Sequence, residues 1–171
     1  MVAAEPSPWV ARFAPLVPAG GRVLDVAAGR GRHTRFFRAR RHPVTAVDRD
    51  TAGLADLGSD AGVEIVERDL EAGAPFPFGE HAFAGVVVTN YLHRPLLPAI
   101  VGAVAGGGVL LYETFARGQE RFGRPQRPEF LLEPGELLEA VRGELRVVAY
   151  EDVVLDDPPR AVQHIAARRE P

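Results

Sequence analysis

Short apolar runs alternate with mixed apolar and charged segments along the chain. The runs are brief, rich in valine and bounded by glycine or polar residues, which is typical of buried parallel strands. They predict strands over Val23–Val26, Val44–Val47, Val63–Val66, Phe83–Val88 and Val109–Tyr112. The mixed segments predict helices over Arg32–Arg41, Thr51–Leu57, Pro95–Val104 and Pro134–Val141. This alternation predicts an α/β fold, a doubly wound and mostly parallel sheet with helices on both faces.

The C-terminal part of the chain departs from this alternation. Its two apolar segments, Leu145–Leu155 and Ala161–Ala167, are joined by DDPPR, which leaves no room for a helix. They therefore predict an antiparallel hairpin. Residues 116–133 show little periodicity and directly follow the fifth strand. A loop of this length in a compact domain is usually either functional or disordered.

Composition narrows the class of protein. A length of 171 residues suits one domain, so residues 1–171 are expected to form a single unit. Hydrophobic residues make up 46% of the chain and charged residues 25%, which is the balance of an ordinary globular protein. A net charge of −3 disfavours a general nucleic-acid binder without excluding one. The sequence contains no cysteine, and all its basic residues are arginine, which excludes thiolate sites, Schiff-base chemistry and a P-loop lysine.

Targeting signals are not evident in the sequence. Prolines interrupt the first eighteen residues, which therefore lack the apolar core of a signal peptide. No uninterrupted apolar run reaches the length needed to cross a membrane. We therefore expect a cytoplasmic protein with no membrane association.

The segment DVAAGRGRHT, residues 25–34, follows the first predicted strand and opens the first long helix. Its small residues let a backbone approach a ligand closely, and the helix behind them offers free N–H groups. Two further acids, Asp48 and Asp69, come at or just past the ends of the second and third strands. Ligands of open α/β sheets bind at this edge, so Asp25, Asp48 and Asp69 are candidates for one binding site.

Two kinds of cofactor could use such an edge. A dinucleotide fingerprint requires glycine or alanine where this chain has Thr34, so that match fails at its last position. Asp25 would also repel a pyrophosphate, whereas it would attract a ligand that carries an ammonium group. The pattern therefore favours a cationic ligand.

The chain resembles the class I S-adenosylmethionine-dependent methyltransferases. The resemblance rests on VLDVAAGRGRHT, VTAVDRD, ERDLE, VVVTNYLHRPLL and GGVLLYETF, and spans roughly residues 20–115. It is strongest with small bacterial methyltransferases of the tellurite-resistance type and with a proteobacterial group that carries a similar ETF and FGRP. Many members have glycine in place of Ala27. The resemblance implies a Rossmann-like sheet of seven strands in the order 3-2-1-4-5-7-6, with the last strand antiparallel.

The resemblance also implies a role for individual residues in binding S-adenosylmethionine. Asp25 and the backbone of Ala27, Gly29 and Gly31 would hold the methionine end, and Asp48 would accept both ribose hydroxyls. The remaining contacts would come from Arg49, Arg68, Asp69 and Leu70 around the adenosine, and from Thr89 and Asn90 beside the sulfonium. From the residues alone, Asp48 could instead cap the helix that opens at Asp50, and Asp69 could be a solvated turn acid. No metal is implied.

The methyl acceptor is expected beyond the fourth and fifth strands. Tyr91, His93 and Glu113 are the candidate general bases, should the acceptor have to lose a proton. Arg124, in the loop 116–133, could bind a carboxylate or phosphate of the acceptor. We expect these four residues to converge with Phe115 and Phe122 around one pocket, because strand ends share one edge. Trp9 and Phe13, four residues apart on a short N-terminal helix, are a second candidate lid.

The predicted function is methyl transfer from S-adenosylmethionine to a small molecule, such as a thiol, a chalcogen or a carboxylate-bearing acceptor. The sequence lacks the Asn-Pro-Pro-Tyr type of motif, which disfavours methylation of exocyclic DNA amines. Two alternatives stay open: a methyltransferase for tRNA or another macromolecule, and a non-catalytic subunit that binds the cofactor and a partner protein. The sequence allows a monomer or a homodimer.

Overall fold

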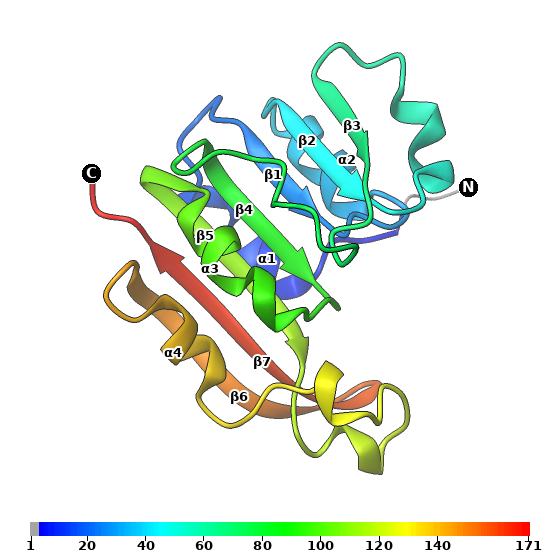
Figure 1. The fold of residues 1–171 in the computed structure, drawn as a ribbon, viewed down its shortest axis with the longest axis vertical. Helices are drawn as coiled ribbons and strands as arrows, with labels where there is room; N and C mark the ends of the chain where they lie inside the picture. Colours follow the sequence, from blue (N-terminus) through cyan, green and yellow to red (C-terminus); the bar gives the residue numbers. More distant parts are fainter. Residues whose placement is uncertain (1–3) are drawn as a thin grey trace.

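The computed structural model describes residues 4–171 and contains one seven-stranded sheet. Its strands are β1 (Val23–Val26), β2 (Val44–Asp48), β3 (Val63–Glu67), β4 (Phe83–Thr89), β5 (Val104–Phe115), β6 (Arg146–Asp156) and β7 (Pro159–Arg168). Their order is β3-β2-β1-β4-β5-β7-β6, and β7 runs antiparallel to both of its neighbours (Figure 1). The predicted fold class, the strand order and the C-terminal hairpin are confirmed.

The helices are short. They are the α-helices α1 (Pro8–Phe13), α2 (Arg32–Ala39), α3 (Leu97–Gly102) and α4 (Glu136–Val141), and the 3-10 helices η1 (Ala14–Leu16), η2 (Ala52–Leu57), η3 (Arg94–Leu96), η4 (Gln119–Arg121) and η5 (Pro128–Phe130). The helix predicted over residues 95–104 is divided into η3 and α3. Pro95 and Pro98 lack an amide hydrogen and fit only the first turn of a helix, so each begins a new one. The segment predicted at 51–57 is the 3-10 helix η2.

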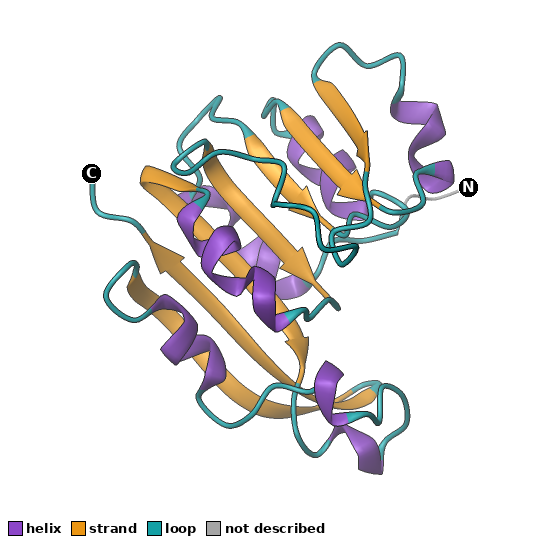
Figure 2. Cartoon of the chain, viewed as in Figure 1, coloured by secondary structure: helices purple, strands orange, loops and turns teal. Residues whose placement is uncertain are grey.

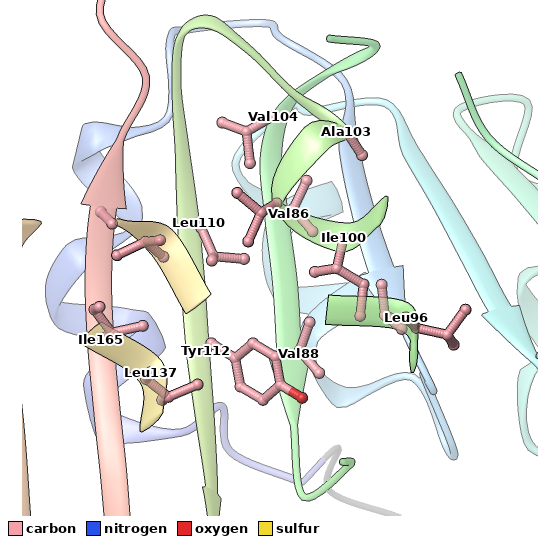
Figure 3. Packing of buried hydrophobic residues seen from close by; sticks show 14 of the residues in the cluster. Val86, Val88, Leu96, Ile100, Ala103, Val104, Leu110, Tyr112, Leu137 and Ile165 are labelled. Carbon is pink, nitrogen blue, oxygen red and sulfur yellow. The ribbon is translucent and has the colours of Figure 1, made fainter. Parts of the chain in front are cut away.

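Helices cover both faces of the sheet, with α3 and α4 on one face and α1 and α2 on the other (Figures 1 and 2). On the central strand β4, Val86 and Val88 pack in the cluster below α3 and α4, and Val87 packs in the cluster with α1. Figure 3 shows Val86 and Val88 beside Ile100 of α3. Because β4 is buried on both faces, its sequence is a continuous apolar run rather than an alternating one.

Tyr112 of β5 links this core to the loop that follows β4. Its ring is buried in the core, 1% exposed (Figure 3). Its hydroxyl donates a hydrogen bond of 2.7 Å to the carbonyl of Tyr91. Loss of this hydrogen bond would cost about 0.5–1.5 kcal/mol, the net contribution of a typical hydrogen bond within a protein. The hydrogen bond therefore fixes the backbone of the loop after β4 relative to β5.

The loop 116–133 is anchored to the sheet. The amide of Gln119, 4% exposed, donates to the carbonyl of Arg124 at 3.1 Å, and its oxygen accepts the N–H of Ala161 at 3.0 Å. Ala116 and Leu132, at the two ends of the loop, form a parallel bridge. These contacts hold the loop beside the carboxyl end of β5, where it forms a wall of the site described next.

Candidate active site

The turn after β1 lies at the edge where the parallel strands end. Ala27 has φ 54° and Gly31 has φ 75°, both in the left-handed region that favours glycine. A Cβ atom on Gly31 would lie 2.5 Å from Cδ2 of Leu54, a buried residue of η2. Only glycine therefore fits without rearrangement at residue 31. Ala27 has a Cβ atom and therefore adopts this conformation less readily than glycine would.

Asp48, at the end of β2, faces this turn. Its Oδ2 accepts the N–H of Gly29 at 2.8 Å, and its Oδ1 accepts the N–H of Asp50 at 3.0 Å. Each carboxylate oxygen can accept two hydrogen bonds, so Asp48 retains acceptor capacity after holding both turns. The capping interaction and a ligand-binding role are therefore compatible in this geometry.

Asp25 lies beneath the turn rather than in the open part of the edge. It is 3% exposed, and the hydroxyl of Thr34 donates to its Oδ2 at 2.6 Å. Burial raises the pKa of Asp25 from 3.8 to about 6, although the hydrogen bonds from Thr34 oppose the rise. At neutral pH this carboxylate is thus a buried negative charge without an ion-pair partner among residues 4–171.

A hollow of about 460 Å³, the inner cleft, opens beside Asp48. It is lined by Ala27, Asp48, Arg49, Arg68, Asp69, Leu70, Glu71, Asn90, Tyr91 and Phe130. Seven of the residues predicted to bind the cofactor belong to this lining: Ala27, Asp48, Arg49, Arg68, Asp69, Leu70 and Asn90. Four others do not line it, namely Asp25, Gly29, Gly31 and Thr89. Gly29 and Gly31 shape the turn itself.

Asp69 and Thr89 also have protein partners. Oδ1 of Asp69 accepts the N–H of Glu71 at 2.9 Å, which makes it a turn acid as well as a lining residue. The hydroxyl of Thr89 lies 3.5 Å from Nδ1 of His33. Burial lowers the pKa of His33 to about 4, so its ring is neutral, and its Nε2 accepts the N–H of Ser7 at 3.0 Å.

A second hollow of about 710 Å³, the outer pocket, adjoins the inner cleft. Among the residues predicted for the acceptor, Tyr91, Phe115 and Arg124 line it. The rest of the lining is Glu71, Asn90, Leu92, Thr114, Pro125, Gln126, Arg127 and Phe130. Glu71, Asn90, Tyr91 and Phe130 line both hollows, so the two are neighbouring parts of one depression.

His93 lies just outside the outer pocket. Its side chain lines an adjacent hollow of about 290 Å³, and its Nδ1 is 4.0 Å from Oε2 of Glu71. Phe122, which we also expected in the pocket, is 40% exposed and outside the lining. Strand ends share an edge, but the loops beyond them turn individual side chains in different directions. The predicted convergence therefore holds for Tyr91, Phe115 and Arg124 only.

Glu113 faces the opposite side of the sheet from the outer pocket. Successive side chains of a strand point to opposite faces, and it is the neighbouring Thr114 that lines the pocket. Oε2 of Glu113 lies 2.6 Å from Nδ1 of the buried His164, on the side of α1. Burial alone would raise the pKa of Glu113, but His164 and Ser7 outweigh it and hold the pKa below its usual range. The structure thus places Glu113 in a buried pair away from Tyr91 and Arg124.

The N-terminal helix α1 packs against this pair and does not cover the outer pocket. Trp9 is 5% exposed, and its ring centroid lies 4.7 Å from that of His164 and 4.6 Å from that of Phe13. The expectation that Trp9 and Phe13 form a lid is therefore wrong for this conformation of the chain. Their helical spacing reflects packing onto the sheet.

Arg94 is a positioning residue that the sequence did not reveal. Its guanidinium contacts the carboxylate of Glu136 at 2.6 and 2.9 Å. The same group donates to the carbonyls of Glu129 at 3.1 Å and Leu131 at 2.8 Å, on either side of Phe130. Arg94 thereby holds the segment that brings Phe130 into the walls of both hollows. In the sequence Arg94 simply precedes Pro95, and no motif there indicates contacts with residues so far along the chain.

Neither a protein-family model nor a curated protein matches the chain. Solved structures do match it. A 1,6-didemethyltoxoflavin-N1-methyltransferase from Burkholderia thailandensis, with bound 1,6-didemethyltoxoflavin and S-adenosylhomocysteine, has a TM-score of 0.74 and 23% identity over 96% of this chain and 78% of its own. TehB from Haemophilus influenzae has a TM-score of 0.74 and 18% identity over 99% of this chain and 64% of its own. The [4+2]-cyclase SpnF has a TM-score of 0.68 and 17% identity over 93% of this chain and 80% of its own.

These likenesses show that the chain has the fold of the S-adenosylmethionine-dependent methyltransferases. Because a cyclase shares this fold, the reaction has to be argued from the site. Within residues 4–171, no three His, Cys, Asp or Glu side chains are grouped so that they could hold a metal ion. The same part of the chain contains no helix that is both long and apolar enough to span a membrane.

Proposed function

We propose that this chain is an S-adenosylmethionine-dependent methyltransferase that acts on a small-molecule acceptor. The observation that carries the proposal is the arrangement of the two hollows. The inner cleft is bordered by Asp48 and the small-residue turn, and it shares walls with a larger, mainly apolar outer pocket. A cofactor in the first and an acceptor in the second would therefore be neighbours.

The residues of the inner cleft suit the groups of this cofactor. Asp48 has free acceptor capacity for ribose hydroxyls, while Arg49, Arg68, Asp69 and Leu70 surround the space for adenosine. The buried charge of Asp25 suits a cationic methionine end, because its carboxylate forms no ion pair among residues 4–171. When bound, S-adenosylmethionine would supply a methyl group on a positively charged sulfur.

The outer pocket suits a small, flat acceptor with a carboxylate. Tyr91, Phe115 and Phe130 give it aromatic walls, which exclude water and orient a ring. Arg124 lines the pocket and has no ion-pair partner among the described residues, whereas Arg127 is paired with Glu129 at 2.8 Å. An unpaired guanidinium can bind a carboxylate through two parallel hydrogen bonds. The Burkholderia structure, which holds 1,6-didemethyltoxoflavin, supports a small-molecule acceptor but says nothing of a carboxylate.

Two observations favour this proposal over its alternatives. An outer pocket of about 710 Å³ leaves room for an acceptor, which a purely cofactor-binding subunit would not need. A tRNA methyltransferase would need a free basic face, yet on α2 Arg35 pairs with Asp56 and Arg38 pairs with Asp60.

Methyl transfer from labelled S-adenosylmethionine into a panel of carboxylate-bearing, thiol and chalcogen compounds, with bulk tRNA alongside, tests the proposal. We expect incorporation into a small carboxylate-bearing acceptor. We also expect Arg124→Ala to raise the KM for that acceptor about tenfold or more, as for loss of a charged hydrogen-bonding pair. Arg121→Ala, in the same loop but outside the lining, is the matched control. Incorporation into tRNA alone would favour the macromolecular alternative, and cofactor binding without any transfer would favour the partner subunit.

A further inference from the structure

Glu71 stands where the three hollows of this edge meet. It lines the inner cleft, the outer pocket and the hollow beside His93. Among the described residues it is the only carboxylate in the lining of the outer pocket. The hydrogen bond from its N–H to Asp69 fixes the backbone at this point, and its side chain is 47% exposed. A proton acceptor at this position would face both the cofactor side and the acceptor side of the site.

The other candidate bases are less suitable in this geometry. Burial and the nearby Glu71 raise the pKa of Tyr91 above its ordinary value, so its hydroxyl keeps its proton. That oxygen is buried and has no hydrogen-bond partner among residues 4–171. Glu113 is paired with His164 on the opposite face. Two candidate proton acceptors remain: Glu71 and His93, whose Nδ1 lies 4.0 Å from Oε2 of Glu71.

The lining of the outer pocket also carries charges of both signs. Glu71 marks the wall shared with the inner cleft, and the guanidinium of Arg124 belongs to the wall formed by loop 116–133. A nucleophile that is already an anion, such as a thiolate or a chalcogen oxyanion, would meet the Glu71 carboxylate and be repelled. A neutral hydroxyl or amine would instead donate a hydrogen bond to it.

We propose that Glu71 is the proton acceptor of the site and that the acceptor is an aromatic hydroxy or amino acid, held by its carboxylate at Arg124. The lone pair of the acceptor oxygen or nitrogen forms the new bond to the methyl carbon. The carbon–sulfur bonding pair stays on sulfur, and the acceptor's proton passes to Glu71. This inference rests on the proposed methyltransferase function and narrows its substrate class.

A matched set of para-substituted benzoates tests the inference: 4-hydroxybenzoate, 4-aminobenzoate and 4-mercaptobenzoate, the last of which supplies a thiolate. Binding is measured by calorimetry on protein saturated with S-adenosylhomocysteine, and labelled-methyl transfer is measured separately. The proteins are the parent chain, Glu71→Gln and the control Glu80→Gln. Glu80 is an exposed carboxylate before β4, at the opposite edge of the sheet.

We expect the parent chain to prefer the hydroxy and amino compounds over the thiolate by tenfold or more. Glu71→Gln should lose tenfold or more in transfer to those two compounds and should bind the thiolate more tightly, while Glu80→Gln matches the parent. Equal behaviour of Glu71→Gln and the parent, or a preference of the parent for the thiolate, would overturn the inference. Binding of S-adenosylhomocysteine with neither binding nor transfer of any of the three benzoates would also overturn it. Failure to bind S-adenosylhomocysteine would instead refute the proposed function itself.

Discussion

Replacing Asp25 with asparagine should stabilise the ligand-free protein and weaken its binding of the cofactor. The carboxylate of Asp25 is 3% exposed, and its one side-chain partner is the hydroxyl of Thr34 at 2.6 Å. An asparagine oxygen can accept the same hydrogen bond without a charge. The substitution therefore removes the cost of burying an ion while it preserves the local packing.

The size of the effect follows from the pKa of Asp25. Burial raises this pKa from 3.8 to about 6, so between these two pH values the folded protein holds a proton that the unfolded chain has released. The free energy of unfolding therefore falls as pH rises through this window, by about 3 kcal/mol in total. Below pH 3.8 both states are protonated and this cost is absent.

Urea unfolding of the two proteins at pH 3.5, 5 and 7 measures this difference. Asp25→Asn should be more stable than the parent by up to about 3 kcal/mol at pH 7, with the gain shrinking toward zero at the lowest pH. Calorimetry should show weaker binding of S-adenosylmethionine, because the buried negative charge is lost. A variant that is less stable than the parent at pH 7, or a gain that does not depend on pH, would refute the reasoning.

Two further predictions concern the turn and its surroundings. Gly31→Ala should destabilise the protein by about 1–3 kcal/mol, since it combines left-handed strain with a clash against Leu54. Gly29→Ala should cost less, because a Cβ atom at residue 29 would meet nothing within 4 Å. Equal losses of stability for the two variants in urea unfolding would contradict this reasoning. The folded-state pKa of His33, about 4, lies below 6.5, so the free energy of unfolding should fall by up to about 3 kcal/mol as pH drops from 6.5 to 4. His33→Gln should lack that loss, and a parent-like loss in the variant would assign it to other groups.

The sheet and its ligand-binding edge could be predicted from the sequence because their signals are local. Brief valine-rich runs mark strands buried on both faces, and Asp48 follows directly on one of them. The turn DVAAGRGRHT places its small residues where the backbone has left-handed φ values, which only a few residue types tolerate. The order of the strands came from the resemblance, since the apolar pattern alone does not determine it.

The acceptor side could not be predicted to the same depth because it depends on contacts between distant segments. The direction of Glu113 depends on which face of β5 each residue occupies near the strand end. The path of loop 116–133 is set by Gln119 and by Arg94, whose partners lie up to 42 residues away. Glu71 is the last residue of the segment ERDLE, but that segment pointed only to Asp69 and its neighbours as cofactor contacts, and only the folded chain brings Glu71 beside Tyr91 and His93.

Calorimetric titration with S-adenosylhomocysteine, for the parent chain and for Asp48→Asn, tests the central claim most directly. The variant retains an oxygen that can accept the N–H of Gly29, but its amide nitrogen cannot accept the N–H of Asp50, and it loses the charge that would bind the ribose hydroxyls. We predict binding of one molecule per chain by the parent, and weaker binding by the variant by about 1–3 kcal/mol, or roughly tenfold to a hundredfold. Equal affinities, or micromolar binding of NADH with no binding of S-adenosylhomocysteine, would contradict the account.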